Sequence, residues 1–148
     1  MRIYMDVCCL NRPFDDQSQD RIRMESEAVL AILNRCLHGW TLVGSEAIDY
    51  EISKIPDDER KTGVKVLAAI SRDKVTVDKS ILIRVSEFEN IGLKALDALH
   101  VACAEKSTEV MLTTDDEIVK RVMTNNNLFT IRVENPVRWL MEVIENEG

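Results

Sequence analysis

The chain has 148 residues, of which 45% are hydrophobic and 30% are charged, a mixture typical of a single globular domain rather than of a disordered or fibrous protein. No apolar run approaches the roughly 18 residues of a membrane span, and Asp6 interrupts the first apolar stretch, so no signal peptide is expected. The net charge of −7 argues against a broad basic face for nucleic acid, but it leaves binding through a divalent cation open. We therefore expect one cytoplasmic domain over residues 1–148, with no membrane contact.

Short β-rich runs alternate with longer helical patterns along the chain. Strands are predicted at residues 3–7, 40–43, 74–77, 110–113 and 129–133. Helices are predicted at residues 25–38, 46–55, 56–71, 80–89, 93–106, 115–123 and 135–145, with Ser45 as the N-cap of the second. This alternation predicts an α/β fold, a three-layer α/β/α sandwich with a mostly parallel central sheet.

The cysteines and histidines do not form a disulfide or zinc pattern. Adjacent Cys8 and Cys9 are poor partners for each other, while Cys36 and Cys103 lie in helix-like apolar segments, where a free thiol behaves as a small hydrophobe. There is no Cys-x-x-Cys motif, and the two histidines are not spaced for zinc. We expect structural thiols, and we expect His100 to satisfy a backbone carbonyl rather than to bind metal.

Two acidic residues follow predicted strands at the edge where parallel sheets bind ligands. Asp6 lies near the end of the first strand, and Asp115 follows the strand at residues 110–113. A turn role for Asp6 is disfavoured because apolar residues continue beyond it. For Asp115 two interpretations stay open. Residues 114–117 match a capping box, with Thr114 as the cap, which would make Asp115 and Asp116 first-turn acids, whereas the position opposite Asp6 favours a functional carboxylate.

Asp97 lies in an otherwise apolar predicted helix. At about 100° per residue it shares a face with Leu93, Val101 and Ala104, so its carboxylate is expected close to the core. Such a carboxylate costs roughly several kcal/mol unless it is paired or bound to metal. An ion pair with Lys94 or a hydrogen bond to a neighbouring strand is the structural alternative, but a functional role is favoured.

Glu51 is distinguished from its acidic neighbours by its position on the predicted helix. The apolar face of that helix consists of Ile48, Ile52 and Ile55, and Glu51 lies about 60° from Ile48, at the edge of this face. Glu46 points nearly the opposite way. We expect Glu51 to look inward at the edge of the sheet, although a half-exposed salt bridge explains the same position equally well.

These residues together resemble the PIN-domain nucleases along the whole chain. The match consists of Asp6 on the first strand, Ser45 with Glu51 on the next helix, the Asp-Ala-Leu-His-x-Ala helix that starts at Asp97, and the Leu-Thr-Thr-Asp segment that ends at Asp115. The resemblance implies a PIN-like fold and a metal-dependent endoribonuclease. Such an enzyme is the toxin of a toxin–antitoxin pair or a stand-alone RNA-processing domain.

The site that the resemblance implies agrees with the chemistry of the residues. Four carboxylates close together repel one another unless a hard cation neutralises them, and ligands that are all oxygen suit Mg²⁺ or Mn²⁺ rather than zinc. Asp6, Asp97 and Asp115 are expected to be direct or water-mediated metal ligands. Glu51 is expected to be a ligand or the acceptor of the water proton, and Asp116 is a reserve. The cation would serve an in-line displacement at phosphorus.

Contacts to the substrate and to partners are less defined. Asn11 and Arg12, in a polar loop at residues 11–20 beside the first strand, are expected to bind substrate, whereas Arg21 and Arg23 are interpreted as solvated loop charges. RNA is the expected substrate partner. The resemblance further implies an antitoxin protein and a homodimer.

Two other functions fit parts of the sequence. A non-catalytic PIN-like module would bind a protein partner through a hydrophobic groove, but it has little reason to keep Asp6, Glu51, Asp97 and Asp115. A phospho-accepting receiver domain needs an acidic pair on the first strand and an acceptor aspartate on a central strand. Asp6 stands alone and Asp97 lies on a predicted helix, so the receiver domain is disfavoured.

Overall fold

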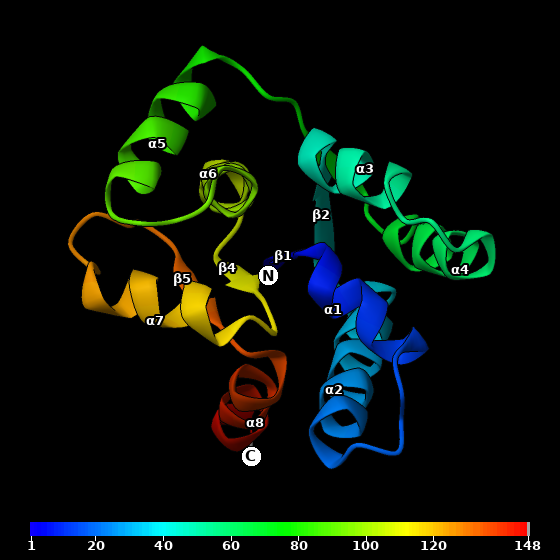
Figure 1. The fold of residues 1–148 in the computed structure, drawn as a ribbon. Coiled ribbons are helices and arrows are strands. Elements are labelled where there is room, and N and C mark those ends of the chain that lie inside the picture. The colour runs from blue at the N-terminus through cyan, green and yellow to red at the C-terminus, as the bar shows by residue number, and fades with distance from the viewer. Residues whose placement is uncertain (148) are drawn as a thin grey trace.

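Five short strands form one sheet in the computed structural model, which describes residues 1–147 (Figure 1). The strands lie in the order β3-β2-β1-β4-β5, and each neighbouring pair is parallel. Their bounds are β1 (Arg2–Met5), β2 (Thr41–Ser45), β3 (Asp73–Val75), β4 (Val110–Leu112) and β5 (Arg132–Glu134). The predicted parallel sheet is therefore confirmed, with strands that are shorter than or shifted from the predicted ones.

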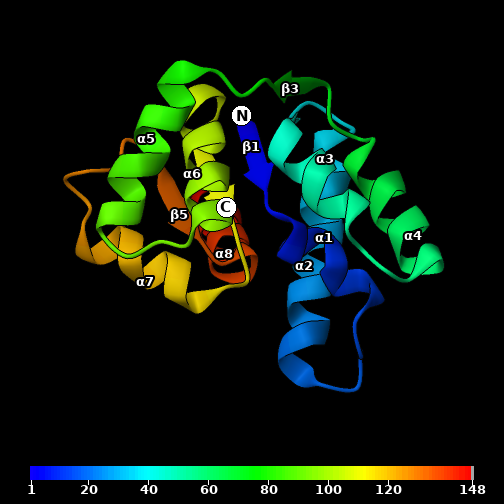
Figure 2. The same cartoon turned by 45° about the horizontal axis from the view of Figure 1, so that its top comes forward.

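Helices connect the strands and cover both faces of the sheet. They are α1 (Val7–Asn11), the 3₁₀ turn η1 (Arg12–Phe14), α2 (Asp20–Cys36), α3 (Glu46–Ser53), α4 (Asp58–Ala68), α5 (Lys79–Asn90), α6 (Ala95–Ser107), α7 (Asp116–Thr124) and α8 (Pro136–Glu147). Helix α6 packs on the strands and on α5, whereas α2 packs on β2 and on α8 (Figures 1 and 2). The sheet thus lies between two helical layers, as the alternation of elements predicts.

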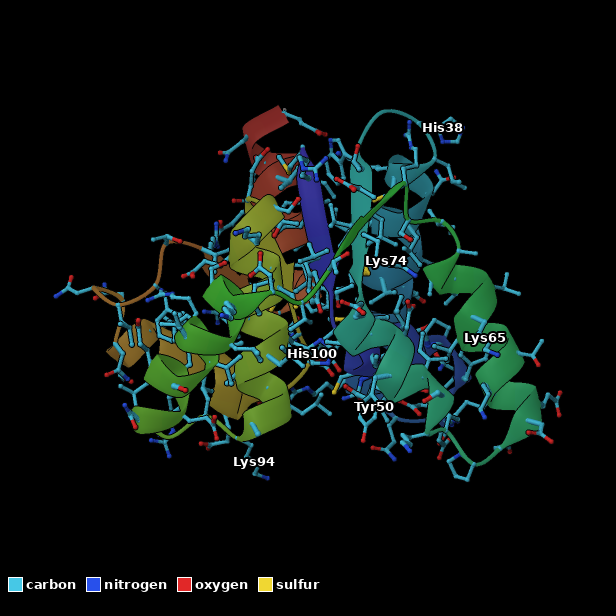
Figure 3. The ribbon with its side chains drawn as sticks, turned by 90° about the horizontal axis from the view of Figure 1, so that it is seen from above. His38, Tyr50, Lys65, Lys74, Lys94 and His100 are labelled. Carbon is cyan, nitrogen blue, oxygen red and sulfur yellow. The ribbon has the colours of Figure 1, made fainter. Side chains whose placement is uncertain are left out.

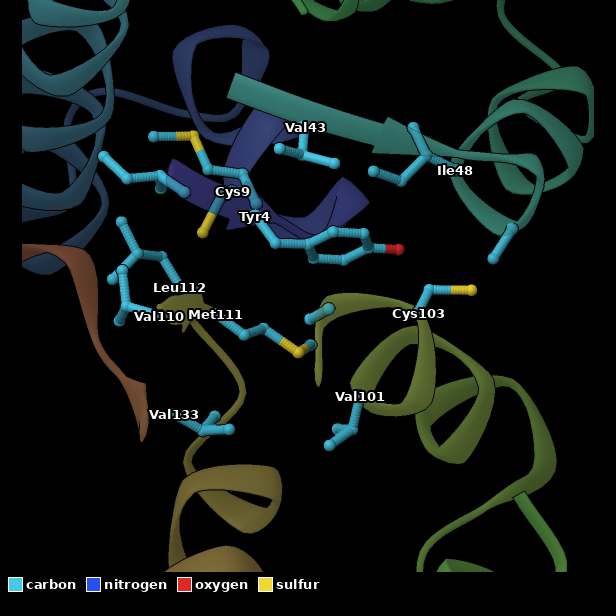
Figure 4. Packing of buried hydrophobic residues seen from close by; sticks show 14 of the residues in the cluster. Tyr4, Cys9, Val43, Ile48, Val101, Cys103, Val110, Met111, Leu112 and Val133 are labelled. Atoms are coloured by element: carbon cyan, nitrogen blue, oxygen red, sulfur yellow. The ribbon is translucent and has the colours of Figure 1, made fainter. Parts of the chain in front are cut away.

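The hydrophobic core lies between the central strands and these helices (Figure 4). Ile3, Tyr4 and Met5 of β1 and Met111 and Leu112 of β4 are completely buried. Strands that are covered on both faces need such continuous apolar runs. Within residues 1–147, no helix combines the length and the apolar character that crossing a bilayer requires.

The segment after β1 departs most from the predicted elements. The strand ends at Met5, two residues earlier than predicted, because Asp6 caps a helix instead: its Oδ1 accepts a hydrogen bond from the backbone N–H of Cys9 at 3.1 Å. The prediction of a polar loop at residues 11–20 is right only for residues 15–19. Its first part is helical through η1, and α2 begins at Asp20, five residues before the predicted start.

Side-chain caps fix the starts of the helices that carry candidate site residues. Ser45 caps α3 as predicted, since its Oγ accepts the N–H of Ile48 at 3.1 Å. Helix α7 is capped by Asp115, whose Oδ1 accepts the N–H of Glu117 at 2.9 Å, so the prediction of Thr114 as the cap is wrong. The capping residue lies one position later because β4 is followed by two buried threonines before the chain turns into the helix.

The order of the strands creates a switch point between β1 and β4. From β1 the chain builds β2 and β3 on one side, and it then crosses over to build β4 and β5 on the other. Ligands of open parallel sheets bind beyond the carboxyl ends of the strands at such a point. Met5 is paired with Leu112, so Asp6 and Thr113 follow the two strands side by side at this edge.

Candidate metal-binding active site

Asp6 is a buried carboxylate at the switch point. It is only 3% exposed, and its Oδ2 accepts a hydrogen bond from the Thr113 hydroxyl at 2.5 Å. The same Thr113 oxygen accepts the backbone N–H of Asp115 at 3.1 Å, which ties both predicted acids to one side chain. Burial raises the pKa of Asp6 to about 6. The Thr113 hydrogen bond and the neighbouring His100 lower this pKa, whereas the charge of Glu51 raises it.

Glu51 reaches the same region through a histidine on the facing helix. The Nε2 atom of His100 lies 2.7 Å from Oε1 of Glu51, and its Nδ1 atom lies 2.6 Å from the hydroxyl of Tyr4. Figure 3 shows His100 between α6 and α3. The prediction that His100 satisfies a backbone carbonyl is wrong, because both ring nitrogens bind side chains. The prediction that Glu51 looks inward is confirmed.

The hydrogen bonds of this group can all be satisfied at the same time. If Nε2–H donates to the Glu51 carboxylate, Nδ1 accepts from the Tyr4 hydroxyl. The Tyr4 oxygen, 2.8 Å from Ser45 Oγ, then accepts from Ser45, which in turn accepts from the N–H of Ile48. Glu51, His100, Tyr4 and Ser45 thus form a hydrogen-bonded relay in which every donor and acceptor is satisfied. The relay connects the cap of α3 to the position of Glu51.

Replacing Tyr4 by Phe should therefore destabilise the protein although it adds no steric conflict. The substitution leaves His100 Nδ1 and Ser45 Oγ buried without their partner, so the free energy of unfolding is expected to fall by about 1–2 kcal/mol. Urea denaturation measures this change. Tyr50→Phe, at an exposed position on α3, is the matched control and should change the free energy of unfolding by less than about 0.5 kcal/mol. Equal effects of the two substitutions would contradict the relay.

Asp97 and Asp115 line one small cavity of about 180 Å³ together with Lys94 and Arg121. Asp97 is half-buried in the first turn of α6 rather than deep in the core. Its burial and the charge of Asp115 raise its pKa, while His100 and Lys94 lower it. No ion pair joins Asp97 to Lys94 in the part of the chain that the structure describes, so the structural alternative for Asp97 finds no support.

The charges of all four predicted carboxylates affect the pKa of one thiol, that of Cys8, at this edge of the sheet. Partial burial raises the pKa of Cys8, and the charges of Asp6, Glu51, Asp115 and Asp97 raise it further. The four carboxylates, distant in sequence, therefore lie within electrostatic range of the start of α1. Cys8 is an exposed free thiol, whereas the other three cysteines are buried and free, as structural thiols are expected to be.

The donor set suits a hard cation, although the side chains do not by themselves form a closed cage. Among residues 1–147, no three His, Cys, Asp or Glu side chains converge closely enough to hold a metal ion. Mg²⁺ commonly keeps several of its waters and is held by one or two carboxylates. Asp97 and Asp115 line the same cavity and both contribute negative charge to it, so they fit such a site. The roles of Asp6, Asp97 and Asp115 as direct or water-mediated ligands, and of Glu51 as a ligand or proton acceptor, stay predictions.

The residues predicted to contact substrate lie in a network of arginines beside the acids. Arg12 donates from Nε to Glu25 Oε1 at 2.8 Å and from Nη1 to Asp15 Oδ2 at 3.0 Å. Asn11 accepts from Arg60, 3.2 Å away. Sequence reasoning missed Arg60. A long cationic side chain in the first turn of a helix, where acids are preferred, is the signal that could have found it.

Asp116, the reserve acid, lies apart from this group. It is exposed, and both of its oxygens accept from Arg21, at 2.8 and 2.9 Å. Arg21 and Arg23 both belong to α2, so their assignment to a loop is wrong; Arg23 pairs with Asp20 at 2.7 Å. The pairing with Arg21 lowers the pKa of Asp116, as expected of a surface ion pair.

Comparisons with known proteins identify the fold. No protein-family profile and no curated protein matches the sequence. A chain in the crystal structure of FitAcB from Neisseria gonorrhoeae matches 90% of this chain and 97% of its own length, with a TM-score of 0.57 and 16% identity. A chain of VapBC2 from Rickettsia felis, bound to a DNA fragment from their promoter, matches 91% and 98%, with a TM-score of 0.58 and 13% identity. This protein has a PIN-domain fold.

A further PIN-fold match is VapBC-1 from nontypeable Haemophilus influenzae, which covers 92% of this chain and 98% of its own length at a TM-score of 0.58 and 10% identity. At such identities the likeness concerns the fold, which confirms the fold that the sequence resemblance implies. Function has to be argued from the site itself.

Proposed function

We propose that this PIN-fold chain is an endoribonuclease that depends on Mg²⁺ or Mn²⁺. The observation that carries the proposal is how four carboxylates meet at the switch point between β1 and β4. Thr113 binds both Asp6 and Asp115, Asp97 shares a cavity with Asp115, and Glu51 pairs with His100 of the same helix as Asp97. Burial and mutual repulsion work against ionisation of Asp97, and a bound cation would relieve both. The fold neighbours, which are PIN-domain toxins, support nuclease chemistry in general.

Each acid has a separate role in this proposal. Asp97 and Asp115 would hold the cation, and Asp6, whose oxygens accept from Cys9 and Thr113, would bind it directly or through water. When bound, the cation would lower the pKa of a water molecule and stabilise the oxyanions of a displacement at phosphorus. Glu51 uses Oε1 for His100, and within residues 1–147 its Oε2 makes no hydrogen bond, so Oε2 is placed to accept the proton of that water.

The substitution Asp97→Asn tests this proposal. It keeps the size of the side chain but removes a charge from the cation site. We expect metal-dependent cleavage of single-stranded RNA to fall by about 100-fold or more, and Mn²⁺ binding measured by titration calorimetry to weaken in parallel. Asp49→Asn is the control, because Asp49 is an exposed carboxylate on α3 that pairs with Lys74.

The two measurements together decide the result. Loss of both Mn²⁺ binding and cleavage in Asp97→Asn, with both retained in Asp49→Asn, supports a metal-dependent ribonuclease. Cleavage by Asp97→Asn at the wild-type rate would exclude the assignment of this acid to the active site.

We further propose that the chain acts as the toxin of a toxin–antitoxin pair. The support is the fold likeness to FitAB and VapBC complexes, which are toxin–antitoxin assemblies. The antitoxin would be a second protein that inhibits cleavage. Co-expression with the product of the neighbouring gene, followed by co-purification and the cleavage assay, tests this role. The homodimer implied by the resemblance stays a prediction.

One observation favours the alternative of a non-catalytic module that binds a protein. An apolar groove of about 910 Å³ lies between α2, α7 and α8, and its lining includes the exposed side chains of Met24, Met123 and Met141. Methionine-rich surfaces adapt to protein partners. This groove lies beyond Asp116, away from the carboxylate group. Wild-type protein that binds no Mn²⁺ and cleaves no RNA would favour the module over the enzyme.

A further inference from the structure

A chain with a net charge of −7 that is to act on RNA has to overcome repulsion at its own active site. Each nucleotide brings a negative phosphate, and the four acids add to the repulsion. Local cations beside the acids are therefore needed to guide the strand. Two cavities border the acids, and Asp115 lines both of them.

The first cavity has a volume of about 500 Å³ and contains the guanidinium groups of Arg12 and Arg60. Both donate to the carboxylate of Asp15, at 3.0 and 2.7 Å, and Arg12 also donates to Glu25 at 2.8 Å, so two guanidinium groups are held near Asp115 by shared carboxylates. Arg60 also donates to the carbonyl of Phe14 at 2.8 Å. The two arginine side chains remain partly exposed, at 22% and 31%, and can therefore reach a ligand.

Arg60 is aimed at this cavity by the packing of α4 on the η1 turn. A β-carbon on Gly63 would lie only 2.5 Å from the ring of Phe14, so only glycine allows this close approach. The turn and the first part of α4 are thus held together, and the arginine pair is fixed relative to Asp115.

The second cavity, which Asp115 also lines, contains the cations Lys94 and Arg121 together with the acids Asp97 and Glu117. Within residues 1–147, Lys94 takes part in no ion pair, and the Arg121 side chain donates only to the carbonyl of Ile91, at 3.3 Å. Gly92 has a φ of +103°, and a β-carbon there would lie 2.5 Å from Nη1 of Arg121. The glycine therefore makes room for the guanidinium. Figure 3 shows Lys94 extending outward at its end of the molecule.

We propose that a single strand of RNA crosses the site over Asp115, with phosphates bound on one side by Arg12 and Arg60 and on the other by Lys94 and Arg121. This inference rests on the proposed function, for which it supplies the path of the substrate. A single strand fits because the two cavities share Asp115 as a wall residue and Asp97 lines the second, so one backbone would pass close to the acids while its flanking phosphates meet cations.

If RNA follows this path, removing a cation from either cavity should reduce the salt dependence of RNA binding. Binding of a fluorescent single-stranded RNA of 12 nucleotides is measured by anisotropy at several KCl concentrations in EDTA, so that no cleavage occurs. Each phosphate contact with a single strand contributes about 0.7 to the slope of log K against log salt. Arg60→Ala and Lys94→Ala should each reduce the slope by about this amount and weaken binding several-fold. The double variant should show the sum of the two changes.

Matched controls lie on the same helices as the cations of the path. Lys65→Ala on α4 and Lys120→Ala on α7 each remove one positive charge outside the two cavities, so they should leave the slope almost unchanged. Arg60→Lys keeps the charge and should keep the slope. Asp15→Asn releases the arginine pair from its carboxylate and should strengthen binding. Circular dichroism checks that each variant is folded.

The outcomes separate this path from the proposed function. Slopes that fall only in the Arg60 variant or only in the Lys94 variant would overturn a crossing path, as would equal effects of the controls. A weakened or unchanged affinity in folded Asp15→Asn would overturn the role of the arginine pair. Because binding is measured without metal, the absence of cleavage in wild-type protein would refute the ribonuclease while leaving the binding result intact.

Discussion

Asp6→Asn is expected to make the metal-free protein more stable at pH 7.5 while it abolishes metal-dependent cleavage. Burial raises the pKa of Asp6 from 3.8 to about 6, so the ionised carboxylate destabilises the folded state at neutral pH by up to about 3 kcal/mol. Asparagine removes this charge but keeps only part of the hydrogen bonding to Thr113. A gain of about 1–2 kcal/mol in the free energy of unfolding is therefore expected, measured by urea denaturation in EDTA.

The stability difference between Asp6→Asn and wild type should depend on pH, because the pKa of Asp6 differs between the folded and unfolded states. A folded-state pKa above the unfolded value means that the contribution of Asp6 to stability is fully present below about pH 4 and is lost as the pH rises through about 6. The advantage of Asp6→Asn over wild type should therefore shrink between pH 7.5 and pH 4. Mn²⁺ should also reduce it, because the cation stabilises the ionised wild-type site.

Asp49→Asn serves as the control for the Asp6 substitution, since it replaces an exposed aspartate. Its effect on the free energy of unfolding should stay within about 0.5 kcal/mol across the same pH range. A wild-type protein that is more stable than Asp6→Asn at pH 7.5 without metal would show that Asp6 is a structural anchor rather than a strained functional carboxylate.

Glu25→Ala is expected to produce the largest loss of stability. Glu25 is 1% exposed, and it accepts from Arg12 at 2.8 Å, from Arg21 at 3.2 Å and from the side-chain amide of Asn135 at 2.6 Å. Removing this buried carboxylate leaves the Asn135 amide without its acceptor and takes one of two carboxylate partners from each arginine, which costs about 3 kcal/mol. Thermal and urea unfolding measure the loss.

Two variants define the cause of that loss. Glu27→Ala removes an exposed carboxylate from the same helix and should cost less than about 0.5 kcal/mol. Glu25→Gln keeps one acceptor oxygen and should fall between the two alanine variants. If Glu25→Ala and Glu27→Ala destabilise equally, the buried network contributes little to stability.

The fold and the placement of the main acids could be predicted from the sequence, because both depend on strong local patterns. Alternating apolar segments determine the parallel sheet, and such a sheet brings together the residues directly after its strands, which places Asp6 and Asp115 at one edge. The position of Glu51 at the border of an apolar helix face likewise determines its inward direction.

The features that could not be predicted depend on contacts between distant segments. His100 has no local sign that it joins Tyr4 to Glu51, since the three residues are separated by more than 40 positions along the chain. The helix after β1 was missed because its run of four apolar residues is too short to show a helical period. The same holds for Arg60, whose place beside Asp115 depends on the packing of α4 on η1.

The pairing of β1 with β4 has a consequence for biosynthesis. Asp6 is synthesised more than 100 residues before the strand that brings its neighbours Thr113 and Asp115 beside it. A nascent chain that stops short of β4 has the first acid and not Asp115. If the protein is the ribonuclease proposed above, it gains its cutting power only after β4 has been made and paired with β1.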